Sequence, residues 1–423
     1  MVTPLRIISA LCTLACSLFM SASPVTDTRN ALVHPSFHTL QVSVDGNEMA
    51  PPIITLGSDD RITISFDELA TDRRYMRYEL IHCNSRWQPD NLVAPEYLDG
   101  FNEASVDDYA FSQATSVPYV NYRITLPNPD MSMKLSGNYL LRVYDENNPD
   151  RTLLQARFSV IEPAVKVNAT VTSRTDIDYN DSHQQLTIAV DTEGLPVSNI
   201  FNDLLISVQQ NGRTDNEAYT SHPTRLAGNV AWFEHDRNLI FPAGNEYRRM
   251  EITSTTYPGM RVSQLSYADP YYHADLFTDY PRNETSYEYD RTQHGRFKVR
   301  EYNSDESDTE ADYIVTHFSL DIPEQNSYDI FLDGDFLQRR FDPQSRMVLN
   351  RATGMYENAI LLKQGAYNYQ YLAVPHGAVT GHTAPIEGDK YQTSNEYLIK
   401  VYYREPGSRY DRLVGASMAT SGI

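Results

Sequence analysis

The chain has 423 residues, which exceeds the size of one ordinary domain and predicts several units with room for large hydrophobic cores. Its 35 basic and 56 acidic residues give a formal net charge of -21, which repels phosphate backbones and anionic membrane surfaces and argues against a nucleic-acid partner. The 30 tyrosines, with many phenylalanine, valine, isoleucine and threonine residues, favour β-sheet over helix.

Residues 1–23 are typical of a secretory signal peptide. Arg6 supplies the positive charge, residues 7–20 form the apolar core, and residues 21–23 form a small-residue cleavage zone. This apolar core is short for a membrane span, and no later segment has the roughly eighteen uninterrupted apolar residues that a spanning helix needs. We therefore expect an exported protein without a membrane span. The sequence TLAC at residues 13–16 partly resembles a lipoprotein cleavage site, so lipidation of Cys16 is left open.

Three cysteines are present, and the signal peptide contains two of them, Cys12 and Cys16. Cys83 is then the only cysteine of the mature chain. An intramolecular disulfide is impossible even in an oxidising compartment, so stability must come from packing.

Residues 24–163 are predicted to form a first β-sandwich. Short runs of alternating apolar and polar residues follow one another from Leu40 and are separated by turn residues, which is typical of antiparallel sandwiches. Pro163 marks the end of this unit.

The same pattern continues in two further units. Residues 164–300 are predicted to form a second β-sandwich, in which the aromatic segment 267–280 is interpreted as an irregular surface or interdomain connector. Residues 301–423 are predicted to form a third sandwich, because their turn and strand order resembles early-set immunoglobulin-like modules, a group that includes glycogen-binding domains. The acidic run 303–312 lacks the glycine and glutamate of an EF-hand and is interpreted as a solvated loop.

The segment 75–101, YMRYELIHCNSRWQPDNLVAPEYLDGF, is the least generic part of the chain. His82 and Cys83 are neighbours on an expected strand and therefore point to opposite faces, which separates a possible nucleophile from its base. We interpret His82 as hydrogen-bonded and Cys83 as buried and inert. Trp87, in the following turn, is interpreted as an anchor between two sheets, with a ligand platform as the alternative.

No motif in the chain specifies catalysis or cofactor binding. His376 and His382 have no spacing that fits a metal site, and nucleophile elbows, phosphate loops and dinucleotide fingerprints are missing from the sequence. We assign no catalytic, cofactor-binding or metal residue, expect no cofactor, and expect a protein that is not an enzyme. Scattered carboxylates leave an unrecognised hydrolase as a further alternative.

Several tyrosines share one strand face by alternation, namely Tyr367, Tyr369 and Tyr371, and also Tyr397 and Tyr403. Most tyrosines are expected to be half-buried sheet residues. Those with exposed hydroxyls would suit a protein interface, where tyrosine is enriched.

The order of several longer segments resembles the plug protein family of the Bacteroidota type IX secretion system. These segments are YELIHCNSRWQPDNL followed by EYLDGF, then VNYRITLPN, LSGNYLLRVYDE and RFSVIEP, then QQNGR at residues 209–213, FPAGNEYRRME at residues 241–251, and TSNEYLIKVYYREPGSRYDRLVG at residues 393–415. The resemblance implies a periplasmic, non-catalytic protein that docks on the outer-membrane translocon barrel and seals its pore between transport events. The resemblance identifies no partner-binding residues, so the sequence leaves them unknown.

One alternative function is an exported carbohydrate-binding module protein, suggested by the early-set-like third unit. Such a protein would need two or three coplanar, exposed aromatic side chains.

Overall fold

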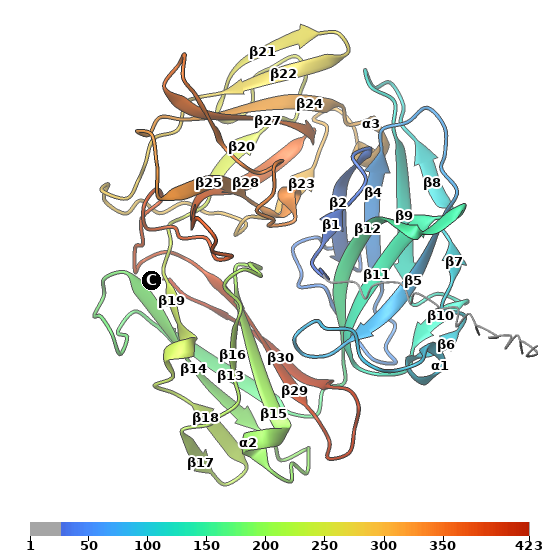
Figure 1. Cartoon of the computed structure of the whole chain (residues 1–423), viewed down its shortest axis with the longest axis vertical. Helices are drawn as coiled ribbons and strands as arrows, with labels where there is room; N and C mark the ends of the chain where they lie inside the picture. Colours follow the sequence, from blue (N-terminus) through green and yellow to red (C-terminus); the bar gives the residue numbers. More distant parts are fainter. Residues whose placement is uncertain (1–26, 423) are drawn as a thin grey trace, which may run out of the picture.

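The computed structural model describes residues 27–422 and consists almost entirely of β-strands (Figure 1). The α-helices in this range are single turns, α1 (Ala94–Tyr97), α2 (Ile200–Asp203) and α3 (Ser307–Glu310). The expected all-β fold of antiparallel sandwiches is confirmed. The expected signal peptide, residues 1–23 with Cys16, lies outside the described residues. No helix within residues 27–422 has the length and apolar character to cross a membrane.

The first core lies between two sheets built from residues 31–161. One sheet has the order β1 (Ala31–Leu32), β12 (Asn148–Ile161), β11 (Gly137–Asp145), β5 (Met76–Cys83) and β7 (Ala104–Ser105), with β3 (Ile53–Thr55) beside β12. The other has the order β2 (Phe37–Val44), β4 (Ile62–Glu68), β9 (Val120–Leu126) and β8 (Asp108–Phe111). A short pair, β6 (Leu98–Gly100) and β10 (Met131–Met133), borders them. Alternate side chains such as Phe66, Leu80 and Phe158 meet between the sheets and are fully buried.

The second core combines two distant parts of the chain. Its first sheet has the order β13 (Lys166–Thr172), β14 (His183–Asp191), β18 (Val230–Phe233) and β17 (Arg225–Ala227), with β19 (Ile240–Pro242) beside β14. Its second sheet has the order β16 (Ala218–Thr220), β15 (Leu204–Gln210), β29 (Glu396–Tyr403) and β30 (Arg412–Thr420). β29 and β30 fall in the range expected for the third sandwich, yet their inward side chains, including Ile399 and Val401, belong to the second core.

The third core is formed by residues 248–386, which lie between the two parts of the second. One sheet contains β20 (Arg248–Glu251), β28 (Gly365–Pro375), β23 (Phe297–Val299) and β25 (Tyr328–Asp333). The other has the order β21 (Val262–Ala268), β22 (Tyr271–Leu276), β24 (Tyr313–Leu320), β27 (Met355–Lys363) and β26 (Val348–Asn350). Two 3-10 turns lie between strands that are consecutive in the chain, η1 (Arg237–Leu239) between β18 and β19 of the second core and η2 (Asp335–Leu337) between β25 and β26 of the third.

The aromatic segment 267–280 is mostly a hairpin rather than an irregular connector. β21 and β22 pair as antiparallel strands around a turn at Asp269 and Pro270, and β22 also pairs in parallel with β24. The proline lies in the turn, where no ladder hydrogen bond is lost, so the aromatic residues on either side can extend as strands.

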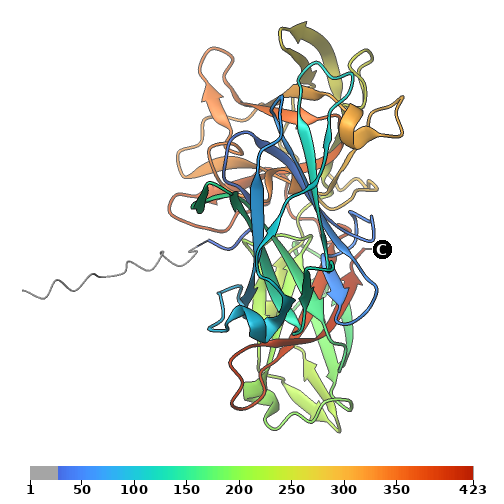
Figure 2. The same ribbon diagram turned by 90° about the vertical axis from the view of Figure 1, so that its right-hand side faces the viewer.

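The three cores form one body. In Figure 1 the third and second cores lie at opposite ends of the long axis, and the first core lies beside both; Figure 2 shows the first core in front of them. Polar contacts join each pair of cores. Lys363 of the third core reaches Asp67 of the first at 2.6 Å, Ser85 N of the first donates to Asp411 of the second at 2.9 Å, and Arg213 of the second donates to Gly381 O at 2.7 Å.

Candidate functional site

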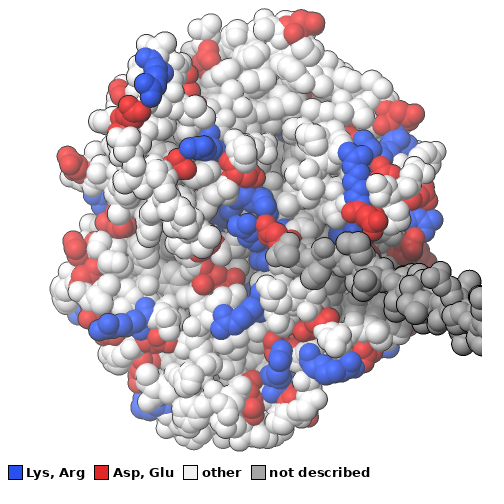
Figure 3. All heavy atoms as spheres, in the orientation of Figure 1, with Lys and Arg blue, Asp and Glu red and all other residues white. Residues whose placement is uncertain are grey.

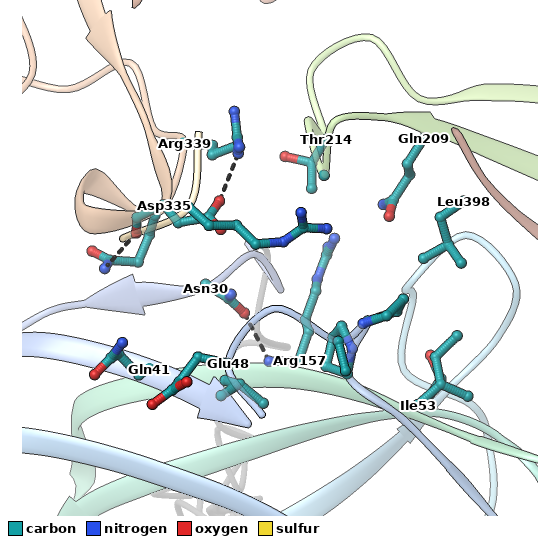
Figure 4. Close-up of a pocket in the computed structure, with 18 of the residues that line it drawn as sticks. Asn30, Gln41, Glu48, Ile53, Arg157, Gln209, Thr214, Asp335, Arg339 and Leu398 are labelled. Carbon is teal, nitrogen blue, oxygen red and sulfur yellow. Dashed lines mark hydrogen bonds and ion pairs between the residues drawn. The ribbon is translucent and has the colours of Figure 1, made fainter. Parts of the chain in front are cut away.

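A cavity of about 190 Å³ opens where the three cores meet, and we call it the basic cleft (Figure 4). Its charged lining comes from all three cores and consists of Arg29, Glu48, Arg157, Arg296, Asp335, Arg339, Glu396 and Lys400. Figure 3 shows basic side chains gathered near the centre of the same face, where the surface is hollowed. The concentration of cations in one cleft contrasts with the net charge of -21.

Trp87 lies against the inner part of the cleft, in the turn that follows β5. Asn84 organises this turn: its side-chain oxygen accepts hydrogen bonds from the backbone N–H groups of Arg86 and Gln88, and Trp87 adopts a positive φ of 60°. The indole is 5% exposed and packs with Cys83 and Leu140 in a small cluster separate from the first core. The prediction that Trp87 packs between the two sheets of a sandwich is therefore wrong, because the indole lies outside the core between those sheets.

Two cations lie against the Trp87 ring. Arg157, from β12, places its guanidinium carbon 4.3 Å from the ring centroid, and Lys400, from β29, places Nζ at 4.9 Å. Because Arg157 belongs to the first core and Lys400 to the second, the indole is held between two cores by cation–π contacts.

Three other cations that line the cleft are neutralised by neighbours. Arg29 pairs with Asp27 at 2.9 Å, and Arg296 pairs with Glu396 at 2.8 Å. Arg339 pairs with Asp335 at 2.7 Å and also with Asp333.

Arg157 and Lys400 lack this neutralisation. Arg157 donates from Nε and Nη2 to the backbone oxygen and hydroxyl of Thr28, at 2.6 and 2.9 Å, and both acceptors are neutral. Lys400 is 2% exposed, and within residues 27–422 its ammonium group has neither a hydrogen-bond acceptor nor a carboxylate within 4.0 Å. Burial lowers the pKa of Lys400 to about 8 and that of Arg157 to about 10, while the charge of Glu217 opposes both shifts.

His82 and Cys83 lie on opposite faces of β5, as the strand pattern predicts. His82 Nδ1 is 2.7 Å from Asp90 Oδ2, and Nε2 is 3.1 Å from Ser136 O, so both ring nitrogens are occupied. Burial raises the pKa of the Cys83 thiol to about 12, which keeps it protonated and unreactive. These residues form a hydrogen-bonded support and a buried thiol rather than a dyad.

His376 and His382 are both exposed in the loop after β28. Within residues 27–422 no cluster of three or more histidine, cysteine, aspartate or glutamate side chains is arranged to hold a metal ion.

The tyrosines that share a face of β28 are buried and do not form an exposed aromatic surface. Tyr367, Tyr369 and Tyr371 are at most 1% exposed, and the hydroxyls of Tyr369 and Tyr371 donate to Asp279 Oδ2 at 2.8 and 2.9 Å. Tyr397 and Tyr403 are likewise buried, in the second core. β28 is paired and covered on both sides, so its tyrosines find their partners inside the protein.

The exposed aromatic side chains are concentrated in residues 257–302 instead. This segment contributes Tyr257, Tyr267, Phe277, Tyr280, Tyr289 and Tyr302, all more than half exposed.

Sequence reasoning did not single out Arg157 or Lys400. Arg157 and Lys400 each lie within a predominantly apolar strand sequence, QARFSV and YLIKVYY. A charged residue in such a strand is the feature that could have drawn attention to them. Because the two positions lie far apart in the chain, only the fold brings them to one indole.

Residues 37–162 match the family model described as the type 9 secretion system plug protein 1st domain. Among solved structures, a hypothetical protein from Parabacteroides merdae ATCC 43184 is 44% identical, with a TM-score of 0.91 over 93% of this chain and 99% of that chain. The partial N-terminal region of an enterococcal surface protein is 7% identical, with a TM-score of 0.20 over 92% of this chain and 95% of that one. The comparison with curated proteins yields no match.

Proposed function

Because the chain belongs to the family of type 9 secretion system plug proteins, we propose that it is a non-catalytic periplasmic subunit that binds the outer-membrane translocon barrel and closes its pore. The observation that carries the proposal is the match of residues 37–162 to the family's first domain. The 44% identical structure extends the same fold over nearly the whole chain.

The way the cores are joined supports a plugging role. A body that occludes a wide channel must resist separation of its parts, and buried hydrogen-bonded junctions provide that resistance. The junction between the first and third cores, which we call the Asp67 junction, consists of Asp67, Asn121, Lys363, Tyr313 and Tyr119. Asp67 accepts from Lys363 at 2.6 Å, from Tyr313 at 2.7 Å and from Asn121 at 2.8 Å, and every one of these residues is buried.

The chain path supports the same role. We propose three sandwiches, residues 27–162, residues 164–242 with 393–422, and residues 243–392 inserted into the second. Two chain crossings then connect the second and third sandwiches, which limits their relative rotation more than a single linker would.

The segment 257–302 is the docking surface that we propose for the barrel. Its six exposed aromatic residues supply large, rigid contact area, and tyrosine is enriched at protein interfaces. The segment belongs to the third sandwich: Tyr267 lies on the edge hairpin β21–β22, and the other five lie in the loops before and after this hairpin and on either side of β23.

The aromatic geometry does not favour a carbohydrate-binding module. Tyr267 and Tyr272, a neighbouring pair on the hairpin, have ring centroids 5.0 Å apart and ring planes inclined at 60°. A platform for sugar rings would need coplanar rings.

Co-purification with the translocon barrel tests the proposal. Tagged protein expressed in its own cells should retain the barrel, and a strain lacking the protein should become more permeable to a large antibiotic. Absence of the barrel from the purified complex, or unchanged permeability, would contradict the plugging role.

Exposed tyrosines in different sandwiches provide matched variants for the docking surface. Tyr257→Ser with Tyr280→Ser should reduce barrel recovery, since these side chains are 74% and 61% exposed and contribute little to folding. The control is Tyr75→Ser with Tyr179→Ser, at 57% and 65% exposure on the first and second sandwiches, and it should retain the barrel. If the two double variants recover equal amounts of the barrel, the segment 257–302 is not part of the interface. Co-purification with the parent protein still tests the plugging role separately.

A further inference from the structure

We propose that the basic cleft binds a small organic carboxylate, which pairs with Arg157 and Lys400 beside the Trp87 indole. The site is distinct from the aromatic segment 257–302 and does not depend on binding to the translocon. Figure 4 shows side chains of all three sandwiches, including Arg157, Thr214 and Arg339, around the cavity that the ligand would enter.

Unused hydrogen-bond donors are the first observation. Lys400 is 2% exposed and borders the cavity, and its ammonium group has no acceptor within residues 27–422. Trp87 is 5% exposed, borders the same cavity, and its buried Nε1–H has no acceptor in this part of the chain. A buried donor such as Trp87 Nε1–H is normally satisfied, and an ammonium group at a cavity wall is normally paired, so the two together point to an acceptor that arrives from outside.

The charge balance defines the ligand. Arg157 and Lys400 carry two positive charges, and Glu217 is the acidic side chain whose charge acts on both. Glu217 lies beyond 4.0 Å from either cation, and its Oε1 is buried without a partner, so it balances one charge from a distance. The two cations therefore have no carboxylate in direct contact, which favours an anionic ligand.

The carboxylates that line the cleft already face other cations. Glu396 is engaged by Arg296, and Asp335 is engaged by Arg339. Glu48 faces Lys298 at 3.6 Å on the outer side. Moving Glu396 or Glu48 inward would leave Arg296 or Lys298 unpaired, whereas Arg339 would keep Asp333 as its second partner.

The uncharged lining indicates that the ligand has an apolar portion. Besides Trp87, the cavity is bordered by Leu40, Ile53, Phe297 and Leu398. Burying apolar groups of a ligand against these side chains adds affinity, which a free inorganic anion does not gain. A carboxylate on an apolar body satisfies both parts of the lining.

The two tryptophans of the chain allow a direct measurement. In purified Trp232→Phe protein, Trp87 is the remaining tryptophan, and its fluorescence can be followed during titration with sodium benzoate. We expect a saturable change with benzoate, and neither benzamide, which has the same shape without charge, nor sodium chloride at equal ionic strength should reproduce it. Sodium phosphate should produce a weaker change than benzoate.

Substitution of Lys400 identifies the site. Lys400→Met should weaken benzoate binding by about 10-fold or more, because it removes a buried charge partner, whereas Lys400→Arg should retain binding. Trp87→Phe protein reports from Trp232, which has an exposed arginine, Arg225, at 4.4 Å, and should show no saturable response.

Three results would overturn the proposal. These are no response of Trp87 to benzoate, an equal response to benzamide, or unchanged benzoate affinity in folded Lys400→Met protein. Because the measurement uses purified protein without the barrel, its failure does not bear on the plugging role.

Discussion

The Asp67 junction and the basic cleft both place a buried lysine between two sandwiches, but they treat its charge in opposite ways. In the Asp67 junction, Lys363 is 1% exposed and contacts Asp67 at 2.6 Å, the Asp308 carbonyl at 2.7 Å, and the face of Tyr119 at 4.2 Å. In the basic cleft, Lys400 is equally buried and has the Trp87 ring nearby, but no carboxylate contacts it within residues 27–422.

The difference separates a structural junction from a binding site. A buried charge that is fully paired holds its neighbours in one arrangement, although it contributes less stability than its contacts suggest, since both charges lose their hydration. A buried charge without a partner costs free energy in the unliganded protein and recovers that cost when an anion binds. Stability measurements on the two lysines and their surroundings can therefore test the contrast directly.

Loss of the Asp67 carboxylate should have the largest effect. Asp67→Ala leaves Lys363 buried without its counter-charge and removes the acceptor of Tyr313, so we expect a loss of about 3–5 kcal/mol in unfolding free energy. Urea unfolding at pH 7 measures it. Replacing both partners, as in Asp67→Leu with Lys363→Met, should cost less than Asp67→Ala alone, and a greater loss in the double variant would show that the charge pair is not what holds this junction.

Loss of the Trp87 indole should come next. Trp87→Ala should lower the unfolding free energy by about 3 kcal/mol, at the lower end of the range for buried aromatic residues, because one side of the indole borders the cavity instead of packed atoms. Chemical denaturation measures the loss, and Trp232→Ala at the half-buried second tryptophan is the control, with an expected loss below that of Trp87→Ala. A negligible loss at Trp87 would mean that the indole does not connect the first and second sandwiches.

Lys400 should show an effect of the opposite sign. Lys400→Met removes an unpaired buried charge, so we expect the unfolding free energy at pH 7 to rise by about 2 kcal/mol. The pKa of Lys400 is about 8 in the folded protein and near 10.5 in the unfolded chain, so below pH 8 the folded state bears the full cost of the charge. Between these values the unfolded chain binds more protons, and the stability of the parent protein rises with pH.

The pH dependence provides the internal control for Lys400. The advantage of Lys400→Met should be greatest below pH 8 and should disappear above about pH 10.5, where the lysine is neutral in both states. Urea unfolding of both proteins at pH 7 and pH 10.5 checks it. An advantage that is the same at both pH values would have to come from packing and not from the charge.

Local patterns in the sequence were sufficient for the strands and for the separation of His82 from Cys83. Alternation of apolar and polar residues fixes which side chains share a face, and this depends only on neighbouring positions. The ordered segments of the chain also pointed to the family whose first-domain model matches residues 37–162. Alternation does not say which core a strand joins, however, and for this reason β29 and β30 could not be assigned to the second core before their pairing with β15 was known.

The candidate site could not be predicted for the same reason. Alternation placed Tyr369 and Tyr371 on one strand face, but it did not identify Asp279, from another part of the chain, which accepts both hydrogen bonds inside the third core. Arg157 and Lys400 meet only because strands from two sandwiches converge on the turn that holds Trp87. Contacts between distant strands decide both cases, and a single sequence does not encode them in a local pattern.

The smallest effect should come from the exposed edge of the Asp67 junction, where Arg123 pairs with Asp308 at 2.6 Å. The two side chains are 40% and 52% exposed, so water screens the pair and Arg123→Ala should lower the unfolding free energy by only about 0.2–1 kcal/mol. Urea unfolding at low and high salt measures this loss. The loss should be smaller at 1 M sodium chloride, because the Debye screening length is then only about 3 Å. The loss for Asp67→Ala should persist at the same salt concentration, because Lys363 is shielded from solvent. A loss at Arg123 as large as that at Asp67 would show that the rim, and not the buried lysine, holds the first and third sandwiches together.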